Sequence, residues 1–510
     1  MAHQWLNRLS FGPTPTALAQ LEKLGKKRFL QAQLAPPKMD KTLLAKKVAF
    51  RFHSDNAVLK NKPFTYLDAP IEELWKLNEE KNQPKRFIPA VEVFANSVLN
   101  AAYNPFQLRE VLVHFWHNHF HVNVDSDERA SITFPLYDKV IRQHCLGNFR
   151  VFLEAVAKSP AMLYYLDNAN SKASPANENY ARELLELHTL GQPAYLNDQH
   201  PHWESVPKDA EGIAKGYIDA DVYEVARAFT GWTVADGAWT FSGIQPNNGQ
   251  FLYYSAWHDP YQKRILGVEF PAHQPPLAEG RRVLDLLAAH PQTAHFVCTK
   301  LCRRLVSDDP PADLVQAAAD RWLQHRDAPD QIRRVVQFII EHEAFEAALG
   351  KKMKTPFELF VSVVRGLDVN IRPNQHLQWM LRELGQPPYQ WASPDGYPDT
   401  EAHWSSSQLL LQRWNLLPKL LFDDWHQLFD WAPDQYAPEG SSSLNLVRGW
   451  LNRLLGIGHD FQHTDRLVGL LTRGERSPND PPLTYGEEDR RYRIAHVLSL
   501  IMMTPTFQYR

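Results

Sequence analysis

Residues 107–123 read QLREVLVHFWHNHFHVN, and the first half of this stretch decides the fold class. Its apolar residues recur three and four positions apart, which is the spacing of one face of an α-helix. Asn104 and Pro105 precede it, and they suit the N-cap and the first position of a helix. The stretch therefore predicts a helix that begins near Pro105 and buries one face.

The same spacing recurs along most of the chain and predicts a mainly α-helical protein. The clearest examples are residues 16–34, 311–324, 329–343, 355–367, 405–422, 444–455 and 489–503. From residue 231 to 270 the spacing is lost, glycine, asparagine and aromatic residues dominate, and residues 240–242 and 251–254 resemble strands. We therefore expect one large helical domain over residues 1–510, with a small β-hairpin or loop insertion around 231–270.

The composition of the 510 residues is typical of a soluble globular protein, with 44% hydrophobic and 22% charged residues. The formal net charge is −3, so no basic excess indicates a nucleic-acid partner. No window of about 18 apolar residues could span a membrane. No signal peptide is recognisable, so we expect a cytoplasmic protein, or an exported one if the chain is a trimmed mature form. Cys298 and Cys302, one helical turn apart, are expected to be buried thiols. The composition leaves the oligomeric state open.

The second half of the opening stretch gathers four histidines within eight residues: His114, His117, His119 and His121. On a helix His114, His117 and His121 share a face, whereas on a strand His117, His119 and His121 do. Either arrangement brings three imidazoles together, and a neutral imidazole is the commonest metal ligand. The alternative is a set of buried histidines that bond to backbone groups and carboxylates.

A second polar stretch, residues 177–188, reads NENYARELLELH and predicts a helix that begins near Asn177. Glu183 and Glu186 lie three positions apart and face the same side, as two metal-binding or acid–base carboxylates would. The alternative is a solvated face held together by Arg182 with Glu178 and Glu186. Because buried charges need partners, we expect the segment around His117 to pack against this helix.

Two loops carry further candidates for acid–base chemistry. His258 precedes Asp259 where the inserted stretch closes, although such a pair is often only a turn device. Asp395 lies in an irregular loop over residues 386–403, next to aromatic residues. Rings beside carboxylates suit a carbohydrate or another polyol, although a loop that serves only packing is an equal alternative.

Several of these motifs, taken in order, resemble a large bacterial family catalogued as domain of unknown function 1800. The matching stretches are RLSFG at 8–12, FWHNHF at 115–120, NENYARELLEL at 177–187, ARAFTGW at 226–232, His258 and Asp259 with Lys263, GYP at 396–398, RWN at 413–415 and MTPTFQYR at 503–510. The resemblance spans nearly the whole chain and implies a single, largely helical body of catalytic type. It assigns no reaction, and of the histidines it includes His117 and His119.

Three hypotheses for the function remain open. The first is a metal-assisted enzyme, a hydrolase or an oxygen-dependent enzyme, that holds a divalent transition metal and acts on a polar substrate. Its metal ligands would be His117, His119 and Glu183, and its catalytic residues Glu178, Arg182, Glu186, His258 and Asp395. The second is a metal-free, glycosidase-like enzyme that uses two of the carboxylates as acid and base. The third is a structural or surface-associated scaffold whose polar residues form one bonded network.

Overall fold

A computed structural model of the chain describes residues 2–37, 51, 57–240, 243–422, 428–431, 433–438, 440–457 and 462–510. The helices are α1 (Ala2–Leu9), α2 (Pro15–Gln33), α4 (Ile71–Trp75), α5 (Ile88–Tyr103), α6 (Gln107–His119), α7 (Glu128–His144), α8 (Phe149–Ala157), α9 (Pro160–Tyr165), α10 (Asn179–Glu183), α11 (Asp219–Ala228), α12 (Ala278–Ala289), α13 (Pro291–Leu305), α14 (Ala312–Gln324), α15 (Gln331–Glu341), α16 (Glu343–Ala347), α17 (Pro356–Leu367), α18 (Gln375–Glu383), α19 (Glu401–Trp404), α20 (Ser407–Phe422), α21 (Pro433–Tyr436), α22 (Ser443–Leu455), α23 (Thr464–Thr472), α24 (Glu487–Met502) and α25 (Pro505–Gln508). The strands are β1 (Trp232–Asp236), β2 (Trp239–Thr240), β3 (Gly243–Ile244), β4 (Asn247–Tyr253), β5 (Lys263–Ile265), β6 (Val268–Phe270), β7 (Asn370–Ile371) and β8 (Phe429–Asp430).

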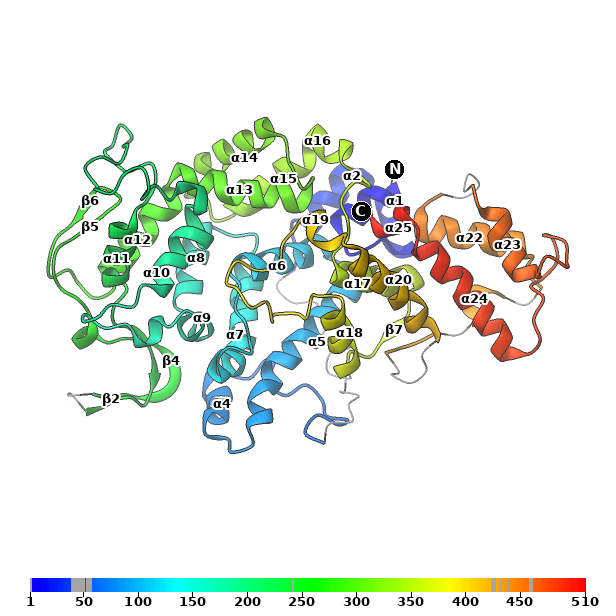
Figure 1. Cartoon of the computed structure of the whole chain (residues 1–510), viewed down its shortest axis with the longest axis horizontal. Coiled ribbons are helices and arrows are strands. Elements are labelled where there is room, and N and C mark those ends of the chain that lie inside the picture. Colours follow the sequence, from blue (N-terminus) through cyan, green and yellow to red (C-terminus); the bar gives the residue numbers. More distant parts are fainter. Residues whose placement is uncertain are drawn as a thin grey trace.

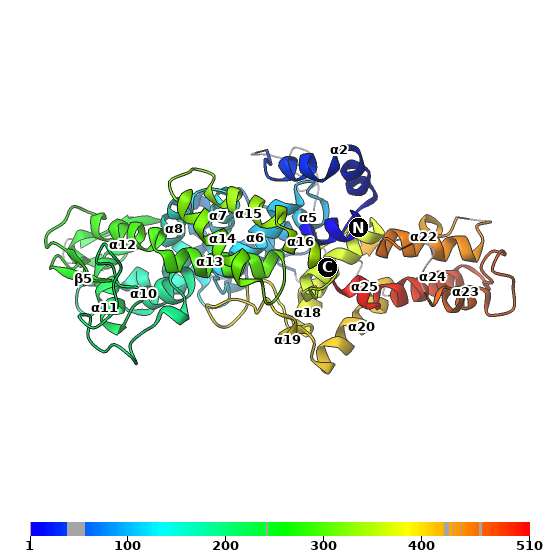
Figure 2. The ribbon, with the colours of Figure 1, turned by 90° about the horizontal axis from the view of Figure 1, so that it is seen from above.

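The molecule is mainly helical, and the described strands form only two-stranded sheets (Figure 1). The predicted fold class is therefore confirmed. Seen from above, the molecule is elongated, with the β insertion near one end and α22 to α24 at the other (Figure 2). In the described part of the chain, no helix has both the length and the apolar surface needed to cross a membrane.

The ends of the helices follow capping rules that the sequence contains. Thr355 caps α17 by accepting a hydrogen bond from the backbone N–H of Glu358, whose own side chain bonds back to the cap. The start of α6 differs from the prediction, because Asn104 ends α5 instead of beginning α6. The Asn104 side chain accepts a hydrogen bond from the backbone N–H of Phe106, and this bond turns the chain into α6.

The predicted β insertion is present between Trp232 and Phe270. β1 pairs with β4 in antiparallel fashion, with Trp232 opposite Tyr253, and β5 pairs with β6. Of the stretch 240–242, Phe241 and Ser242 lie outside the described residues. One further pairing, between β7 and β8, joins segments that are distant in the sequence and was not predicted.

Two large apolar clusters form the interior. One contains side chains from α1 to α16, and the other is built mainly by α17 to α25. α5 and α6 supply side chains to both, with Val93 and Leu112 in the first cluster and Val98 and Val111 in the second. α6 therefore lies at the junction of the two cores.

A long irregular segment, residues 386–399, crosses this junction and is called the crossing loop below (Figure 1). Its Tyr389 carbonyl accepts a hydrogen bond from the backbone N–H of Val124, at 3.0 Å. Near its other end Asn118 of α6 bonds to both backbone groups of Tyr397, at 2.7 Å each. The crossing loop is thus bonded directly to the end of α6 and to the chain that follows it.

Candidate functional site

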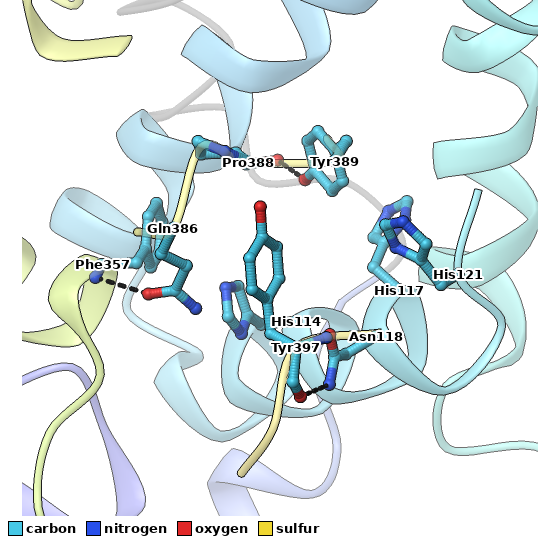
Figure 3. A pocket seen from close by; sticks show the side chains of 10 residues that line it. His114, His117, Asn118, His121, Phe357, Gln386, Pro388, Tyr389 and Tyr397 are labelled. Carbon is cyan, nitrogen blue, oxygen red and sulfur yellow. Dashed lines mark hydrogen bonds between the residues drawn. The ribbon is translucent and has the colours of Figure 1, made fainter. Parts of the chain in front are cut away.

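Three of the four histidines line one cavity between α6 and the crossing loop. The rings of His114, His117 and His121 surround a hollow that Tyr397 and Gln386 of the loop close from the other side (Figure 3). The empty volume is about 440 Å³, including its open mouth. The helical alternative for these histidines is therefore confirmed, although His121 stands just beyond the last residue of α6.

His117 belongs to a buried network of charged groups. Its Nε2 donates to Asp138 Oδ1 at 3.0 Å, and Asp138 also accepts from Arg142 Nε at 2.8 Å. Arg142 in turn donates to Glu110 at 2.6 Å. Burial tends to raise the pKa of Asp138, but Arg142 and His117 outweigh it and hold that pKa well below its usual range. For His117 the structure thus fits the alternative of a bonded, buried histidine.

His119 points to the opposite side of α6. Its Nε2 donates to the backbone carbonyl of His188 at 3.2 Å, and the ring of Phe120 lies 5.2 Å from that of His188. The predicted contact between this segment and the second polar stretch is confirmed, but through His119 instead of His117. Because positions two apart on a helix face different sides, the structure does not bring His117 and His119 together as paired ligands.

A metal site of the predicted kind has no preformed ligand set in the described part of the chain. Nowhere among those residues do three or more His, Cys, Asp or Glu side chains gather so that they could hold a metal ion. Glu183, the third predicted ligand, lies on α10 and has neither His117 nor His119 as a partner.

The second polar stretch forms α10 and continues as a π-helical turn, η4 (Leu184–Thr189). The Thr189 hydroxyl donates to the Leu184 carbonyl at 2.6 Å, which holds the widened turn. Such turns are rare and recur at functional sites. Glu183 and Glu186 are half-buried on this segment, and neither forms a hydrogen bond or ion pair with another described residue. The helix was predicted, but the π-helical turn was not.

The environment of Glu183 favours the protonated form of its carboxyl group. Burial and the neighbouring charge of Glu186 raise the pKa of Glu183 to about 7, with Asp395 adding to the rise and Arg182 opposing it. Asp395 is exposed and accepts a hydrogen bond from Trp391 Nε1 at 2.9 Å. Asp395 of the crossing loop is therefore one of the charges that act on Glu183.

Two residues that the sequence did not indicate complete this group. Lys300 on α13 is half-buried and has no hydrogen bond or ion pair to another described residue. Burial lowers the pKa of Lys300 to about 8, although Asp395 opposes the shift. The hydroxyl of Tyr165 is buried without a partner, and burial raises its pKa, with Glu183 and Asp395 adding to the rise. Nothing in the local sequence distinguishes either residue from an ordinary surface lysine or core tyrosine.

The remaining predicted residues serve other roles. Glu178 is exposed, and its carboxylate lies 3.8 Å from Arg182 Nη2, which is also 3.4 Å from Asp219. The solvated-face alternative therefore applies to Glu178 and Arg182. No described ion pair joins Arg182 to Glu186.

His258 lies in a separate buried network and not with the carboxylates of α10. Its Nδ1 donates to the Thr230 carbonyl at 2.9 Å, and its Nε2 lies 3.3 Å from Glu279 Oε2. Glu279 also pairs with Lys263 at 2.6 Å. These bonds fasten the β insertion to the start of α12.

The fold and the site define a mainly helical protein. Charged side chains that form no ion pair with another described residue stand on its π-helical turn, on α13 and on an irregular loop. The chain belongs to the family described as protein of unknown function (DUF1800), whose profile matches residues 4–509. The resemblance drawn from the sequence motifs is therefore confirmed over essentially the whole chain. No curated protein and no solved structure matches it.

Proposed function

We propose that the protein is a hydrolase of glycosidase type, in which Glu183 and Asp395 act as the carboxyl pair on a carbohydrate or related polyol. The proposal rests on the Glu183 carboxyl group, which is half-buried and has no partner among the described residues. Burial and the charge of Glu186 raise the pKa of this group to about 7. In glycosidases one carboxyl group with a raised pKa donates a proton to the leaving oxygen, and an ionised one acts as base or nucleophile.

The geometry supports a division of roles between the carboxyl groups. Glu183 is the proton donor because it is half-buried and its pKa of about 7 leaves part of the carboxyl protonated near neutral pH. Asp395 is the second carboxyl group of the pair, because it is exposed and comes from the crossing loop, an element separate from α10. Glu186 does not need to touch the substrate, and it acts as a positioning residue that keeps the pKa of Glu183 high.

The surroundings of the pair suit a polyol. Trp391 presents a half-buried ring next to Asp395 and holds it through the 2.9 Å hydrogen bond. The buried hydroxyls of Tyr165 and Tyr217 have no partner among the described residues, and the carboxylates of α10 and η4 act on the pKa of both. Aromatic faces and unused hydroxyls are the groups that bind the apolar and polar faces of a sugar ring.

Two other hypotheses have less support. The metal-assisted one requires His117 and His119 on one side of α6, and they point to different sides. The scaffold hypothesis fits the bonded networks around His117 and His258, but it does not account for Glu183 and Lys300. Charged groups that are partly buried without a partner lower the stability of the fold, and a purely structural role does not explain why such groups are present.

The proposal is tested by hydrolysis of a panel of oligosaccharides and aryl glycosides. Glu183→Gln should lower kcat by about 10²–10⁴-fold on substrates with poor leaving groups, the range expected for the loss of a general acid. The loss should be much smaller for 4-nitrophenyl glycosides, whose leaving group needs no proton. Glu178→Gln, which changes an exposed carboxylate on the same segment, is the matched control and should keep full activity. Equal rates for Glu183→Gln and wild type on a poor leaving group would contradict the proposal.

A further inference from the structure

His119, His188 and Lys300 form a second group of polar side chains with atoms that have no partner among the described residues. His119 and His188 are each 1% exposed. Both ring nitrogens of His188 and the Nδ1 of His119 have no hydrogen-bond partner among the described residues. Lys300 has no bonded partner there either. These are groups that a natural interior normally pairs.

The three side chains come from separate elements that meet at one place. The rings of His119 on α6 and His188 on η4 lie 6.4 Å apart between centroids. Phe296 on α13 connects them to the lysine, because its ring lies 6.4 Å from that of His119 and 5.5 Å from Lys300 Nζ. Lys300 is also the charged neighbour that acts on the pKa of both histidines.

Lys300, His119 and His188 can each donate a hydrogen bond. A lysine offers a positive charge and three N–H bonds, and a neutral imidazole offers one N–H bond. Burial lowers the pKa of His188 to about 3, so its ring is neutral at physiological pH. Asp395 is one opposite charge that acts on Lys300, but it accepts the hydrogen bond of Trp391, and no ion pair within 4.0 Å joins it to Lys300. A ligand with negative charge and several acceptor oxygens fits these donors.

We propose that Lys300, together with the one N–H group of the neutral His188 ring, binds an anionic group rich in oxygen, such as a carboxylate, sulfate or phosphate. Under the proposed function, on which this step rests, the substrate is an acidic glycan whose anionic group occupies this position while Glu183 protonates the scissile oxygen. The anion site itself does not depend on hydrolysis, because its donors are distinct from the carboxyl pair.

Calorimetric titration of the full chain tests the anion site directly. Inorganic sulfate, inorganic phosphate and glucuronate are the probes, and glucose is the neutral control. We expect at least one of the three anions to bind and glucose to bind more weakly than glucuronate. The preferred anion distinguishes a uronic acid from a sulfate or phosphate ester. Absence of binding by all three anions would overturn the proposal.

Variants identify the residues that hold the anion. Lys300→Met should weaken anion binding about tenfold or more, the loss expected for a charge-assisted hydrogen bond. Lys351→Met, which removes an exposed lysine beyond α16, is the matched control and should bind as wild type does. His188→Asn tests the contribution of the second donor to anion binding. It also replaces Lys300→Met as the test variant if that protein does not fold. Unchanged affinity in both site variants would overturn the assignment.

Glu183→Gln separates this inference from the proposed function. It should lose hydrolysis yet keep its affinity for the anion. If it binds the anion and also hydrolyses as wild type does, the proposed function fails and the anion site stands. If wild type hydrolyses neutral and acidic glycans equally well and Lys300→Met changes neither rate, the anion inference fails alone.

Discussion

Replacing Glu183 with glutamine is expected to make the protein more stable at pH 8, although the change removes a charged residue from a partly exposed position. The pKa of Glu183 rises from 4.5 to about 7 on folding, mainly because of burial and of Glu186. Between these two values the folded protein binds more protons than the unfolded chain, so stability falls as pH rises through this window. Glutamine stays neutral and avoids that loss.

The size of the expected gain in stability follows from the shift in the pKa of Glu183. About 2.5 pKa units at about 1.36 kcal/mol each give an upper value of about 3 kcal/mol above pH 7. Because Glu183 is only half-buried, solvent screening reduces this, and we expect a gain of about 1–2 kcal/mol for Glu183→Gln at pH 8. At pH 4.5 the two proteins should differ by only a few tenths of a kcal/mol, since Glu183 is then protonated in the folded protein and about half protonated in the unfolded chain.

The assay is urea unfolding of both proteins at pH 4.5 and pH 8, followed by tryptophan fluorescence. The midpoint of Glu183→Gln should lie clearly above that of wild type at pH 8 and nearly coincide with it at pH 4.5. Glu178→Gln, on the same segment, should show no such gain because its carboxylate is exposed and paired with Arg182. A lower midpoint for Glu183→Gln at pH 8 would refute the reasoning, since it would mean that the carboxylate has stabilising partners.

Four further outcomes are expected. Asp138→Asn should lower the free energy of unfolding by about 3–5 kcal/mol in urea unfolding at pH 7, because it breaks a buried ion pair on one side. In wild type the contribution of Asp138 should be lost as pH falls below about 4, since its pKa is lowered in the fold. Glu186→Gln should move the alkaline loss of hydrolysis to lower pH, measured as the pH profile of kcat/KM, because it removes a charge that raises the pKa of Glu183. Gly396→Ala should lower the melting temperature strongly, because its φ is +75° and an added Cβ would lie 2.2 Å from the Asn118 carbonyl oxygen.

Much of the fold follows from local sequence patterns. Apolar spacing is a property of a short segment, and it placed helices such as α14 and α24 within a few residues of their observed bounds. The insertion was visible because the spacing disappears there. The pairing of β7 with β8 was not predictable, since two residues on each side leave no period to recognise.

The site was only partly predictable, because its assembly depends on where elements end and meet. Glu183, Glu186 and Asp395 stand in polar stretches that interrupt apolar ones, so their types alone marked them as candidates. The pairing of His117 with His119 failed because α6 runs through both, and a helix turns them to different sides. Lys300 could not be found from its neighbours in sequence, because its unusual environment is made by the crossing loop and by residues of α6 and η4.

The measurement that tests the central claim most directly is a carbon-13 NMR titration of the glutamate carboxyl groups. Burial raises the pKa of Glu92 as well as that of Glu183 to about 7, so wild type should show two resonances that titrate near neutral pH. Glu183→Gln should lack one of them and keep the other. If every resonance near pH 7 persists in Glu183→Gln, Glu183 is ionised at neutral pH and cannot be the proton donor that the account requires.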